Sequence, residues 1–324
     1  MKAWRAETLE SIDDYRLVDL PLPEPAKGQA RIRVRACGVG YVDALVSLGR
    51  YQVKPPLPHT PGGEIAGVID ALGEGVEGLA VGQRVMAQAA GGFAEYALAP
   101  AASVVPLPDK LDFAAASGLR INYLTALHGL RQRAMLRPGE RLLVLGAAGG
   151  VGAAAVQVGR LLGAQVVAAA STEAKRAFCL EHGADQAIDT DPEGWRDRLK
   201  ALTEDKGPDV VFDPVCGPLF QPAFRSLAWG GRHLVVGFAG GPIPALPANL
   251  PLMKGAALIG VDVRQFLLFE VARARTDLAD LMAWIAEGRL SPPVGRVFTF
   301  DQGREALEFA LSGQGAGKTV LAID

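Results

Sequence analysis

The fold of this chain is decided by one stretch of sequence, Leu142-Leu143-Val144-Leu145-Gly146-Ala147-Ala148-Gly149-Gly150-Val151-Gly152. An apolar run of strand length meets a glycine-rich turn, and the turn opens into an alanine-rich segment that ends at Gly163. A strand, a turn and a helix in this order form the phosphate-binding part of a dinucleotide site. The N-terminus of the helix would offer unpaired backbone N–H groups to a pyrophosphate. Gly149 and Gly150 would let the backbone approach the phosphates, and Gly152 would let the helix lie close to the strand.

The motif alone is a weak signal, because the usual first glycine is Ala147 here and many glycine-rich turns bind nothing. Its surroundings strengthen it. Apolar runs of strand length recur at 165–170, 186–189, 209–213, 233–238 and 257–261, and helical patterns separate them at 173–182, 193–202 and 219–227. This alternation predicts an α/β fold with a doubly wound parallel sheet that is covered on both faces. A ligand would bind at the carboxyl ends of the strands, at the turn 146–152 and near residues 237–241.

The end of the second predicted strand bears on the choice of cofactor. An acidic residue there would bind the ribose 2′-hydroxyl of NAD, but this chain has Ala170-Ser171-Thr172. Ser171 can donate to a 2′-phosphate, and Lys175 and Arg176 follow one turn into the next helix, where they would stabilise its charge. We therefore expect NADPH rather than NADH, although Glu173 adds a negative charge nearby. The alternative is that Lys175 and Arg176 only solvate a helix face.

The N-terminal third has a different pattern. Short strands are predicted at 31–36, 64–72 and 84–87, with prolines and glycines between them. After about residue 264 a long helical segment and two further strand patterns, at 296–300 and 318–323, contain no second dinucleotide turn. We expect a β-rich catalytic domain made of residues 1–121 and 264–324, and a dinucleotide-binding (Rossmann) domain made of residues 122–263. The active cleft would lie between the two domains.

Composition excludes several classes of partner. The net charge of −2 comes without any basic block, so neither nucleic acid nor an anionic membrane surface is expected as a partner. The three cysteines are widely spaced and odd in number, which indicates a reducing compartment and no disulfide framework. The N-terminus lacks the apolar core of a signal peptide, and no apolar run reaches bilayer-spanning length. We expect a cytoplasmic protein.

Six short motifs in a specific order and spacing carry a resemblance over essentially the whole chain; they lie at 62–67, 92–96, 122–127, 147–152, 226–232 and 317–321. With these motifs the chain resembles the medium-chain dehydrogenase/reductase superfamily and, within it, the zinc-free NADPH:quinone oxidoreductase (zeta-crystallin-like) branch. The resemblance implies a nucleotide-binding domain inserted into a split β-rich, GroES-like domain.

The resemblance also bears on zinc. Zinc alcohol dehydrogenases of this superfamily place a metal-binding Cys where this chain has Gly40, and a metal-binding His where it has Gly63. A catalytic zinc needs three such ligands, so we expect no metal. Without a Lewis acid, the expected acceptor is one that is already polarised: a quinone, or an alkene conjugated to a carbonyl.

Catalytic roles are expected for Tyr51, as a donor to the substrate oxygen, and for Thr125, whose position in the family places a hydroxyl against the nicotinamide. Tyr51 could equally be an aromatic residue packed in a loop. Arg120 stands where many relatives have proline, and either an anionic substrate tail or solvent could face it. The expected cofactor-binding residues are Gly40, Tyr41, Asn122, Thr125, Ala147, Gly149, Gly150, Val151, Gly152, Ser171, Lys175, Arg176, Gly237, Phe238, Ala239 and Lys318.

The function expected from these observations is NADPH-dependent quinone reduction by hydride transfer. Two alternatives stay open: reduction of an enone, enal or enoyl thioester on the same fold, and a structural, crystallin-like role that keeps only the cofactor site. The sixth predicted strand would close one side of the sheet, and an apolar edge of this kind invites pairing across a two-fold axis. We therefore expect a homodimer.

Overall fold

The computed structural model describes every residue of the chain, 1–324. It contains two compact units, a β-rich unit made of Met1–Arg120 and Ser291–Asp324 and a parallel-sheet unit made of Ile121–Leu290. The first boundary lies one residue from the expected position. The second differs, because residues 264–290 belong to the parallel-sheet unit. Buried Asp277 explains the difference, since its carboxylate accepts hydrogen bonds from Arg131 and Gln132 of that unit.

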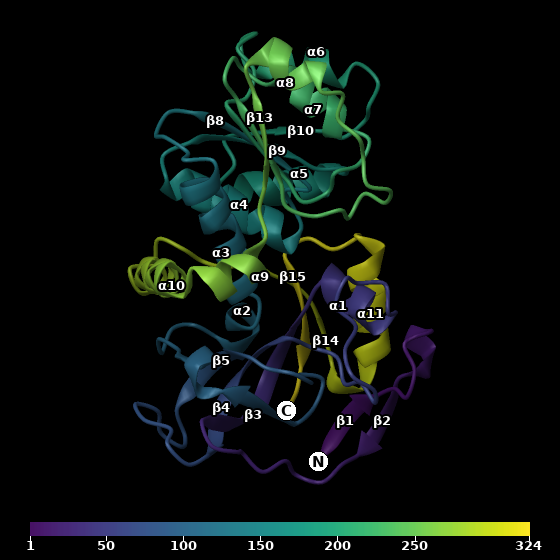
Figure 1. Cartoon of the computed structure of the whole chain (residues 1–324), viewed down its shortest axis with the longest axis vertical. Helices are drawn as coiled ribbons and strands as arrows, with labels where there is room; N and C mark the ends of the chain where they lie inside the picture. Colours follow the sequence, from purple (N-terminus) through teal and green to yellow (C-terminus); the bar gives the residue numbers. More distant parts are fainter. The chain divides into compact units, whose positions relative to one another are not determined.

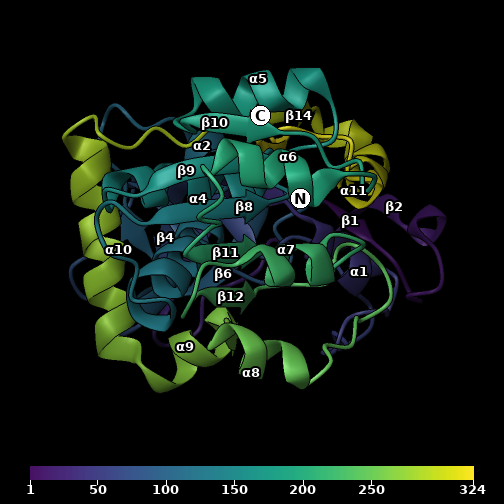
Figure 2. The same ribbon diagram turned by 90° about the horizontal axis from the view of Figure 1, so that it is seen from above.

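The parallel-sheet unit is built on six strands in the order β10-β9-β8-β11-β12-β13, and every neighbouring pair is parallel. Figure 2 shows β10, β9, β8, β11 and β12 following one another in this order. The chain passes from β8 outward through β9 to β10 and then returns to β11 on the other side of β8, which creates the switch point where α/β sheets bind ligands. The expected doubly wound sheet is confirmed. Its strands are β8 (Arg141–Leu145), β9 (Gln165–Ala169), β10 (Gln186–Ile188), β11 (Val210–Asp213), β12 (Arg232–Val235) and β13 (Ala257–Gly260).

Helices separate these strands as the sequence pattern indicates. The first of them, α4, lies directly on the sheet, because a Cβ on Gly159 would come within 2.4 Å of Leu142 Cδ2. Thr172 caps the next helix, α5, by accepting a hydrogen bond from the Lys175 backbone N–H. The helices of this series are α3 (Arg120–Leu127), α4 (Gly150–Leu161), α5 (Glu173–Glu181), α6 (Trp195–Leu202), α7 (Phe220–Ser226) and α8 (Asn249–Lys254), with the π-helical segment η3 (His128–Arg133) after α3.

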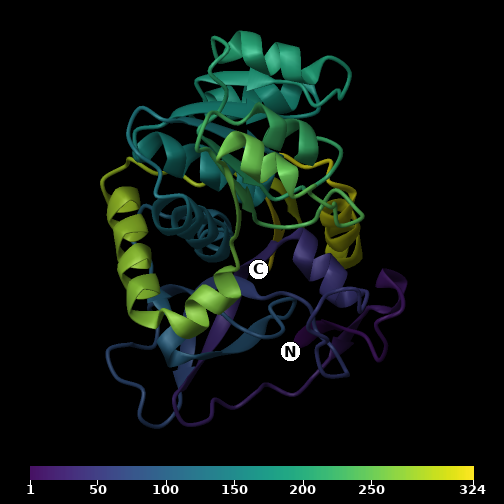
Figure 3. The same ribbon diagram turned by 45° about the horizontal axis from the view of Figure 1, so that its top comes forward.

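Two further helices complete the unit. α9 (Val263–Phe269) and α10 (Val271–Ala286) follow one another across a sharp bend at Glu270, visible as the yellow-green helices of Figure 3. The ring of Phe266 in α9 stacks on His128 with ring centroids 3.9 Å apart. Together with the buried Asp277 in α10, this contact holds the helical segment in the parallel-sheet unit.

One predicted strand is shorter than expected. The pattern at 233–238 predicts a strand through Phe238, but β12 ends at Val235. The chain then turns toward the loop after β11, where the N–H groups of Ala239 and Gly240 donate to Pro214 and Val215 carbonyls at 3.3 and 2.7 Å.

The β-rich unit contains a seven-stranded sheet in the order β14-β15-β3-β4-β5-β7, with β6 also paired to β3, and all pairs are antiparallel except β14 with β15. A two-stranded sheet, β1-β2, lies outside it. Figure 1 shows the late strands, in yellow, beside the early ones. The elements are β1 (Lys2–Arg5), η1 (Ile12–Asp14), β2 (Arg16–Asp19), β3 (Gln29–Val39), α1 (Tyr41–Ser47), β4 (Glu64–Leu72), β5 (Arg84–Gln88), β6 (Tyr96–Pro100), η2 (Ala101–Ser103), β7 (Val105–Pro106), α2 (Phe113–Ala116), β14 (Val294–Phe298), η4 (Phe300–Gln302), α11 (Gly303–Ser312) and β15 (Lys318–Ala322).

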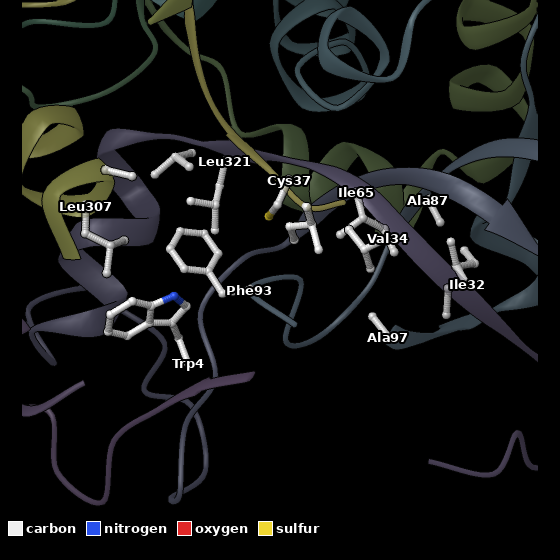
Figure 4. Close-up of a cluster of buried hydrophobic side chains, with 14 of the residues drawn as sticks. Trp4, Ile32, Val34, Cys37, Ile65, Ala87, Phe93, Ala97, Leu307 and Leu321 are labelled. Carbon is white, nitrogen blue, oxygen red and sulfur yellow. The ribbon is translucent and has the colours of Figure 1, made fainter. Parts of the chain in front are cut away.

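The core of the β-rich unit joins the two ends of the chain. Trp4 and Phe93 pack with Leu307 and Leu321 in one buried cluster (Figure 4). The indole N–H of Trp4 donates to the Phe300 carbonyl at 2.7 Å, which satisfies its one polar group inside the cluster. Burial of each large apolar side chain contributes about 1.5–3 kcal/mol, so the C-terminal segment stabilises the N-terminal sheet. Across both units, the helices are too short or too polar for any of them to cross a membrane.

Candidate functional site

The glycine-rich turn has the geometry of an anion-binding site. Gly146 adopts a left-handed φ of 59°, and its carbonyl accepts the Gly149 N–H at 3.0 Å. Gly149 is the N-cap of helix α4 and makes no side-chain cap hydrogen bond, so the N-cap residue leaves the N–H groups of the first turn to other acceptors. A Cβ on Gly152 would lie 2.2 Å from the Gly146 carbonyl oxygen, which leaves room only for glycine. The turn therefore offers backbone donors and the positive end of a twelve-residue helix to a phosphate.

Ala147 fits the place where the motif usually has glycine. Its side chain is fully buried, and its N–H donates to the Ala169 carbonyl at 3.1 Å. Ala147 does not need the left-handed conformation, because Gly146 makes the turn. The methyl group at position 147 is therefore accommodated in the interior of the unit.

Helix α3 brings Asn122 to the start of α4. A Cβ on Gly150 would lie 2.8 Å from Asn122 Nδ2, so glycine at this position admits the amide. The neighbouring Tyr123 has a different role, since its hydroxyl donates to Gln157 Oε1 at 2.7 Å and burial raises its pKa. Tyr123 packs α3 against α4, and Asn122 is the residue of the pair that reaches the turn.

The three residues that are expected to bind a 2′-phosphate follow the end of β9. Ser171 is exposed between β9 and α5, and Arg176 Nη1 donates to the Ala170 carbonyl at 3.2 Å. Lys175 lies in the first turn of α5, and burial lowers the pKa of its ammonium. A phosphate dianion at this place would offset that effect of burial, because opposite charge favours the protonated form. Ser171, Lys175 and Arg176 thus surround one strand end.

The loop after β12 reaches the same edge of the sheet. Gly237, exposed Phe238 and Ala239 form its first part. The Val215 side chain, from the loop after β11, lies against the glycine-rich turn, because a Cβ on Gly146 would be 2.8 Å from it. The turn and the loops after β11 and β12 therefore meet at the carboxyl edge of the sheet, where the sequence predicts the ligand.

Thr125 is buried in α3, and its hydroxyl donates to the Ile121 carbonyl at 2.6 Å. That hydrogen bond uses the only proton of the hydroxyl group. The oxygen can still accept a hydrogen bond, so Thr125 can receive an amide N–H but is not a proton donor while this bond is kept.

The β-rich unit holds a half-buried charge cluster around Lys318, made of Lys318, Glu64 and Asp43. Lys318 Nζ lies 3.2 Å from Glu64 Oε2, with side chains only 11% and 12% exposed. Burial lowers the pKa of Lys318, but the charges of Glu64 and Asp43 outweigh it and hold that pKa above its usual value. Burial raises the pKa of Asp43, against the opposing effects of the Lys318 charge and of hydrogen bonds from Gly40 and Gly63. The cluster binds one lysine between two carboxylates.

Gly40 is hydrogen-bonded to this cluster, and Tyr41 follows it in the chain. Gly40 N–H donates to Asp43 Oδ2 at 2.7 Å at the start of α1, and Tyr41 is the first, half-buried residue of that helix. Lys318 passes between glycines: a Cβ would lie 2.8 Å from Lys318 Cε if built on Gly38 and 2.5 Å from Cγ if built on Gly118. A Cβ on Gly40 would begin 3.5 Å from Nζ.

Tyr51 and Arg120 both belong to the β-rich unit. Tyr51 is half-buried in the loop after α1, outside any helix or strand. Arg120, the first residue of α3, donates from Nη1 to the Ser103 carbonyl at 2.5 Å, and its buried Nε has no hydrogen-bond partner. Burial lowers the pKa of Arg120, and the Glu64 charge opposes that effect. The guanidinium is therefore partly held inside the β-rich unit rather than free in solvent.

The residues present do not fit a catalytic zinc. Gly40 and Gly63 carry no ligand atoms, and no group of three or more His, Cys, Asp or Glu side chains is arranged to hold a metal ion. Cys37 is enclosed by glycines, since a Cβ would lie 2.6 Å from its sulfur if built on Gly62 and 2.8 Å if built on Gly92. Burial raises the pKa of this thiol well above its usual value. Cys37 is therefore a packed thiol and not a thiolate ligand.

Comparison with known proteins agrees with this architecture. An alcohol dehydrogenase GroES-like domain matches residues 26–109, and a zinc-binding dehydrogenase domain matches residues 150–287. The quinone oxidoreductase of Sus scrofa is 35% identical over 308 residues, which cover 94% of this chain and 92% of that protein. A quinone oxidoreductase from Thermus thermophilus, solved also with NADPH, is 35% identical, with a TM-score of 0.86 and 100% of both chains covered. A probable oxidoreductase from Mycobacterium abscessus is 35% identical, with a TM-score of 0.89 and 100% and 99% of the two chains covered.

A split GroES-like unit joined to a doubly wound sheet with a glycine-rich turn defines an oxidoreductase of the medium-chain dehydrogenase/reductase superfamily. The name of the second matched domain does not imply a metal here, because its span, 150–287, includes neither Gly40 nor Gly63. Within the superfamily, the chain belongs to the quinone oxidoreductase family.

Proposed function

We propose that this protein reduces quinones with NADPH by hydride transfer and without a metal ion. The observation that carries the proposal is the carboxyl edge of the parallel sheet. The uncapped N-terminus of α4 suits a pyrophosphate, and the end of β9 has Ser171, Lys175 and Arg176 but no acid at 170–172. Relatives named as quinone oxidoreductases, and the NADPH complex of the Thermus thermophilus relative, support the same reading.

The adenosine end of the cofactor would be held by charge. Lys175 and Arg176 would bind the 2′-phosphate with Ser171 as a hydroxyl donor, and charge-assisted hydrogen bonds of this kind are the stronger ones. An acidic residue at the strand end would instead favour the free ribose 2′-hydroxyl of NADH. Backbone N–H groups of Gly150, Val151 and Gly152 would bind the pyrophosphate.

The nicotinamide end of the cofactor would be bound by the remaining residues at the carboxyl edge of the parallel sheet. Thr125 would accept a hydrogen bond from the carboxamide, because its own proton is used by Ile121. Asn122 and the backbone of residues 237–239 would bind beside it. NADPH, when bound, supplies the hydride. The protein's task is then to orient the acceptor and to exclude water.

The acceptor must bring its own polarised carbonyl, because the residues of this chain provide no ligand set for a Lewis-acidic metal. A quinone satisfies this requirement. We propose that Tyr51 donates a hydrogen bond to the quinone oxygen as negative charge develops there. We propose that Gly40, Tyr41 and Lys318 of the β-rich unit also bind the cofactor.

The proposed setting is a homodimer in a reducing compartment. All three cysteines are free and buried, so none is placed for a disulfide. The edge strand β13 pairs only with β12 and leaves Leu258 42% exposed, which suits pairing with a second copy.

The test is rapid mixing of the protein and NADPH with a panel of quinones, conjugated enals and enoyl thioesters. Oxidation of NADPH by quinones supports the proposal. Oxidation by enals or enoyl thioesters alone would replace it with alkene reduction, and NADPH binding without turnover would indicate a structural role. Ethanol or a secondary alcohol with NADP should give no product. Alcohol turnover at rates like those of quinones would overturn the reductase assignment.

A further inference from the structure

An acid and a histidine form a buried pair inside the parallel sheet. Asp213 is the last residue of β11, His233 lies in β12, and both side chains are 0% exposed. His233 Nε2 lies 3.1 Å from Asp213 Oδ2. Polar groups are rarely buried this completely without a reason, because each loses its hydrogen bonds to water.

The second oxygen of Asp213 holds the loop that follows β11. Oδ1 accepts the backbone N–H of Val215 at 2.9 Å and that of Cys216 at 2.7 Å. Cys216 adopts a left-handed φ of 47°, a conformation that a non-glycine residue keeps only when its surroundings hold it there. Burial and then the Asp213 charge raise the pKa of the Cys216 thiol, so this cysteine stays protonated beside the carboxylate.

The surroundings of His233 favour one arrangement of its proton. The rings of Phe220 and Phe224 lie 4.9 and 6.0 Å from its ring, and Nδ1 is buried with no partner. A proton on Nδ1 would be a buried donor without an acceptor, which is unfavourable. The tautomer that carries the proton on Nε2 avoids this cost and donates to Asp213. Three donors therefore converge on one carboxylate.

The loop held by Asp213, residues 214–217, connects to both sides of the proposed cofactor edge. On one side the Val215 side chain fills the space beside Gly146 of the glycine-rich turn. On the other side the Val215 carbonyl accepts the Gly240 N–H at 2.7 Å. The backbones of Gly217 and Gly240 are so close that a Cβ on Gly240 would lie 2.6 Å from Gly217 Cα.

We propose that Asp213 and His233 are positioning residues for the nicotinamide half of the cofactor. They hold the loop 214–217, and this loop in turn sets the residues after β12 against the glycine-rich turn. The adenosine half would be held at the end of β9, which lies on the other side of β8 from β11, and would not depend on the pair. The inference rests on the proposed use of NADPH.

The experiment compares the dissociation constants of two ligands by calorimetry: NADPH, and adenosine 2′,5′-bisphosphate, which lacks the nicotinamide. Asp213→Ala removes all three hydrogen bonds, and we expect it to weaken NADPH about tenfold while leaving the bisphosphate within about twofold. Asp213→Asn keeps an oxygen for the two backbone N–H groups, so it should restore most of the NADPH affinity. His233→Phe keeps a ring beside Phe220 and Phe224 and leaves both backbone hydrogen bonds of Asp213 in place, but it removes the donor that orients the carboxylate, so it should weaken NADPH by less than Asp213→Ala does.

Asp209→Ala is the matched control at the other end of β11, where the Asp209 carboxylate accepts the Arg141 N–H at 2.8 Å. It should lower the thermal midpoint but leave both dissociation constants unchanged. If Asp213→Ala and His233→Phe do not fold, Val215→Ala provides the test. This substitution loosens the loop without changing the buried pair, and it should still raise the dissociation constant of NADPH. Equal weakening of both ligands, or unchanged NADPH binding in Val215→Ala and every folded variant of the pair, overturns the inference. Absence of NADPH binding by the unmodified protein overturns the proposed function and this inference with it.

Discussion

Lys318 Nζ lies 3.2 Å from Glu64 Oε2, inside the β-rich unit, with Asp43 as a second carboxylate near the same ammonium. In zinc enzymes of the superfamily the neighbouring positions 40 and 63 carry metal ligands, whereas here they are glycines whose N–H groups bind Asp43. A side-chain cation of this chain thus balances the acidic groups.

Lys318→Met should destabilise the fold more at neutral pH than at acidic pH. The raised pKa of Lys318 means that its stabilising effect is complete below the pKa of the unfolded chain, about 10.4, and is present throughout the range tested. Without it, Asp43, whose pKa burial already raises, loses the opposite charge that lowers that pKa, so the free energy of unfolding should fall as pH rises from about 5 to 7. We expect a loss of about 3 kcal/mol at neutral pH by urea unfolding.

The matched control is Lys27→Met, because Lys27 pairs with Glu74 at 3.0 Å on the exposed surface. That change should cost less than about 1 kcal/mol at either pH. Equal losses at both pH values in Lys318→Met would show that the two carboxylates are not coupled through the lysine.

NADPH should be preferred over NADH by at least about tenfold in Michaelis constant, or about 1.4 kcal/mol. Lys175→Ala should weaken NADPH and leave NADH nearly unchanged, because only NADPH carries the 2′-phosphate. Lys200→Ala, on an exposed position of α6, serves as the control and should affect neither cofactor. Similar losses for both cofactors would remove the assignment of Lys175 to the 2′-phosphate.

Tyr51→Phe should lower turnover with a quinone by about 10- to 100-fold while leaving the dissociation constant of NADPH unchanged. The reason is that a donor to developing charge acts in the transition state more than in the ground state. Tyr96→Phe, in the sheet strand β6, should leave turnover unchanged. Full turnover in Tyr51→Phe would make Tyr51 a packing residue and leave solvent as the proton source.

The purified protein should contain no stoichiometric zinc, and chelators should leave quinone reduction intact. Gly40 and Gly63 supply no ligands, and Cys37 is a packed thiol. Elemental analysis after purification without added metal is the measurement. One zinc per chain would contradict the prediction.

The protein should be a dimer by light scattering at micromolar concentration, with β13 at the interface. Leu258→Lys places a charge on this exposed edge and should give a monomer. Val297→Lys is the control, because Val297 is likewise exposed on an edge strand, β14, of the other sheet. Dissociation by Val297→Lys instead would move the interface to the β-rich unit.

The strands and helices of the parallel sheet could be predicted closely from the sequence, because continuous apolar runs and glycine stops are local signals. The assignment of residues 264–290 to the parallel-sheet unit could not be predicted from the sequence. Helix α10 is amphipathic, and an amphipathic face does not say which unit covers it. Asp277 was the available clue, since a carboxylate among apolar helix positions requires partners, and Arg131 and Gln132 provide them from 145 or more residues away.

The candidate site likewise has one part that could be predicted from the sequence and one part that could not. The glycine-rich turn and the residues at the end of β9 are local in sequence and could be recognised. The pair of Glu64 and Lys318 and the pair of Asp213 and His233 bring together residues that are 254 and 20 positions apart, and no local pattern signals either pair. The direction of the Thr125 hydrogen bond was also beyond the sequence, because it depends on the rotamer of one buried side chain.

The three glycines around Lys318 carry a consequence for the history of this family of sites. A ligating side chain at position 40 would start 3.5 Å from the lysine ammonium, so the two compete for one small volume. Evolution from a metal ligand at position 40 to Lys318, or the reverse, by single substitutions must pass through one of two intermediates. One intermediate has both the ligand and the lysine in the same small volume. The other has neither, so that Glu64 and Asp43 lack a nearby positive charge. We expect both intermediates to be less stable than the forms before and after them. Lys318 and the glycine at position 40 therefore constrain each other. A single substitution is not expected to restore a metal ligand at position 40.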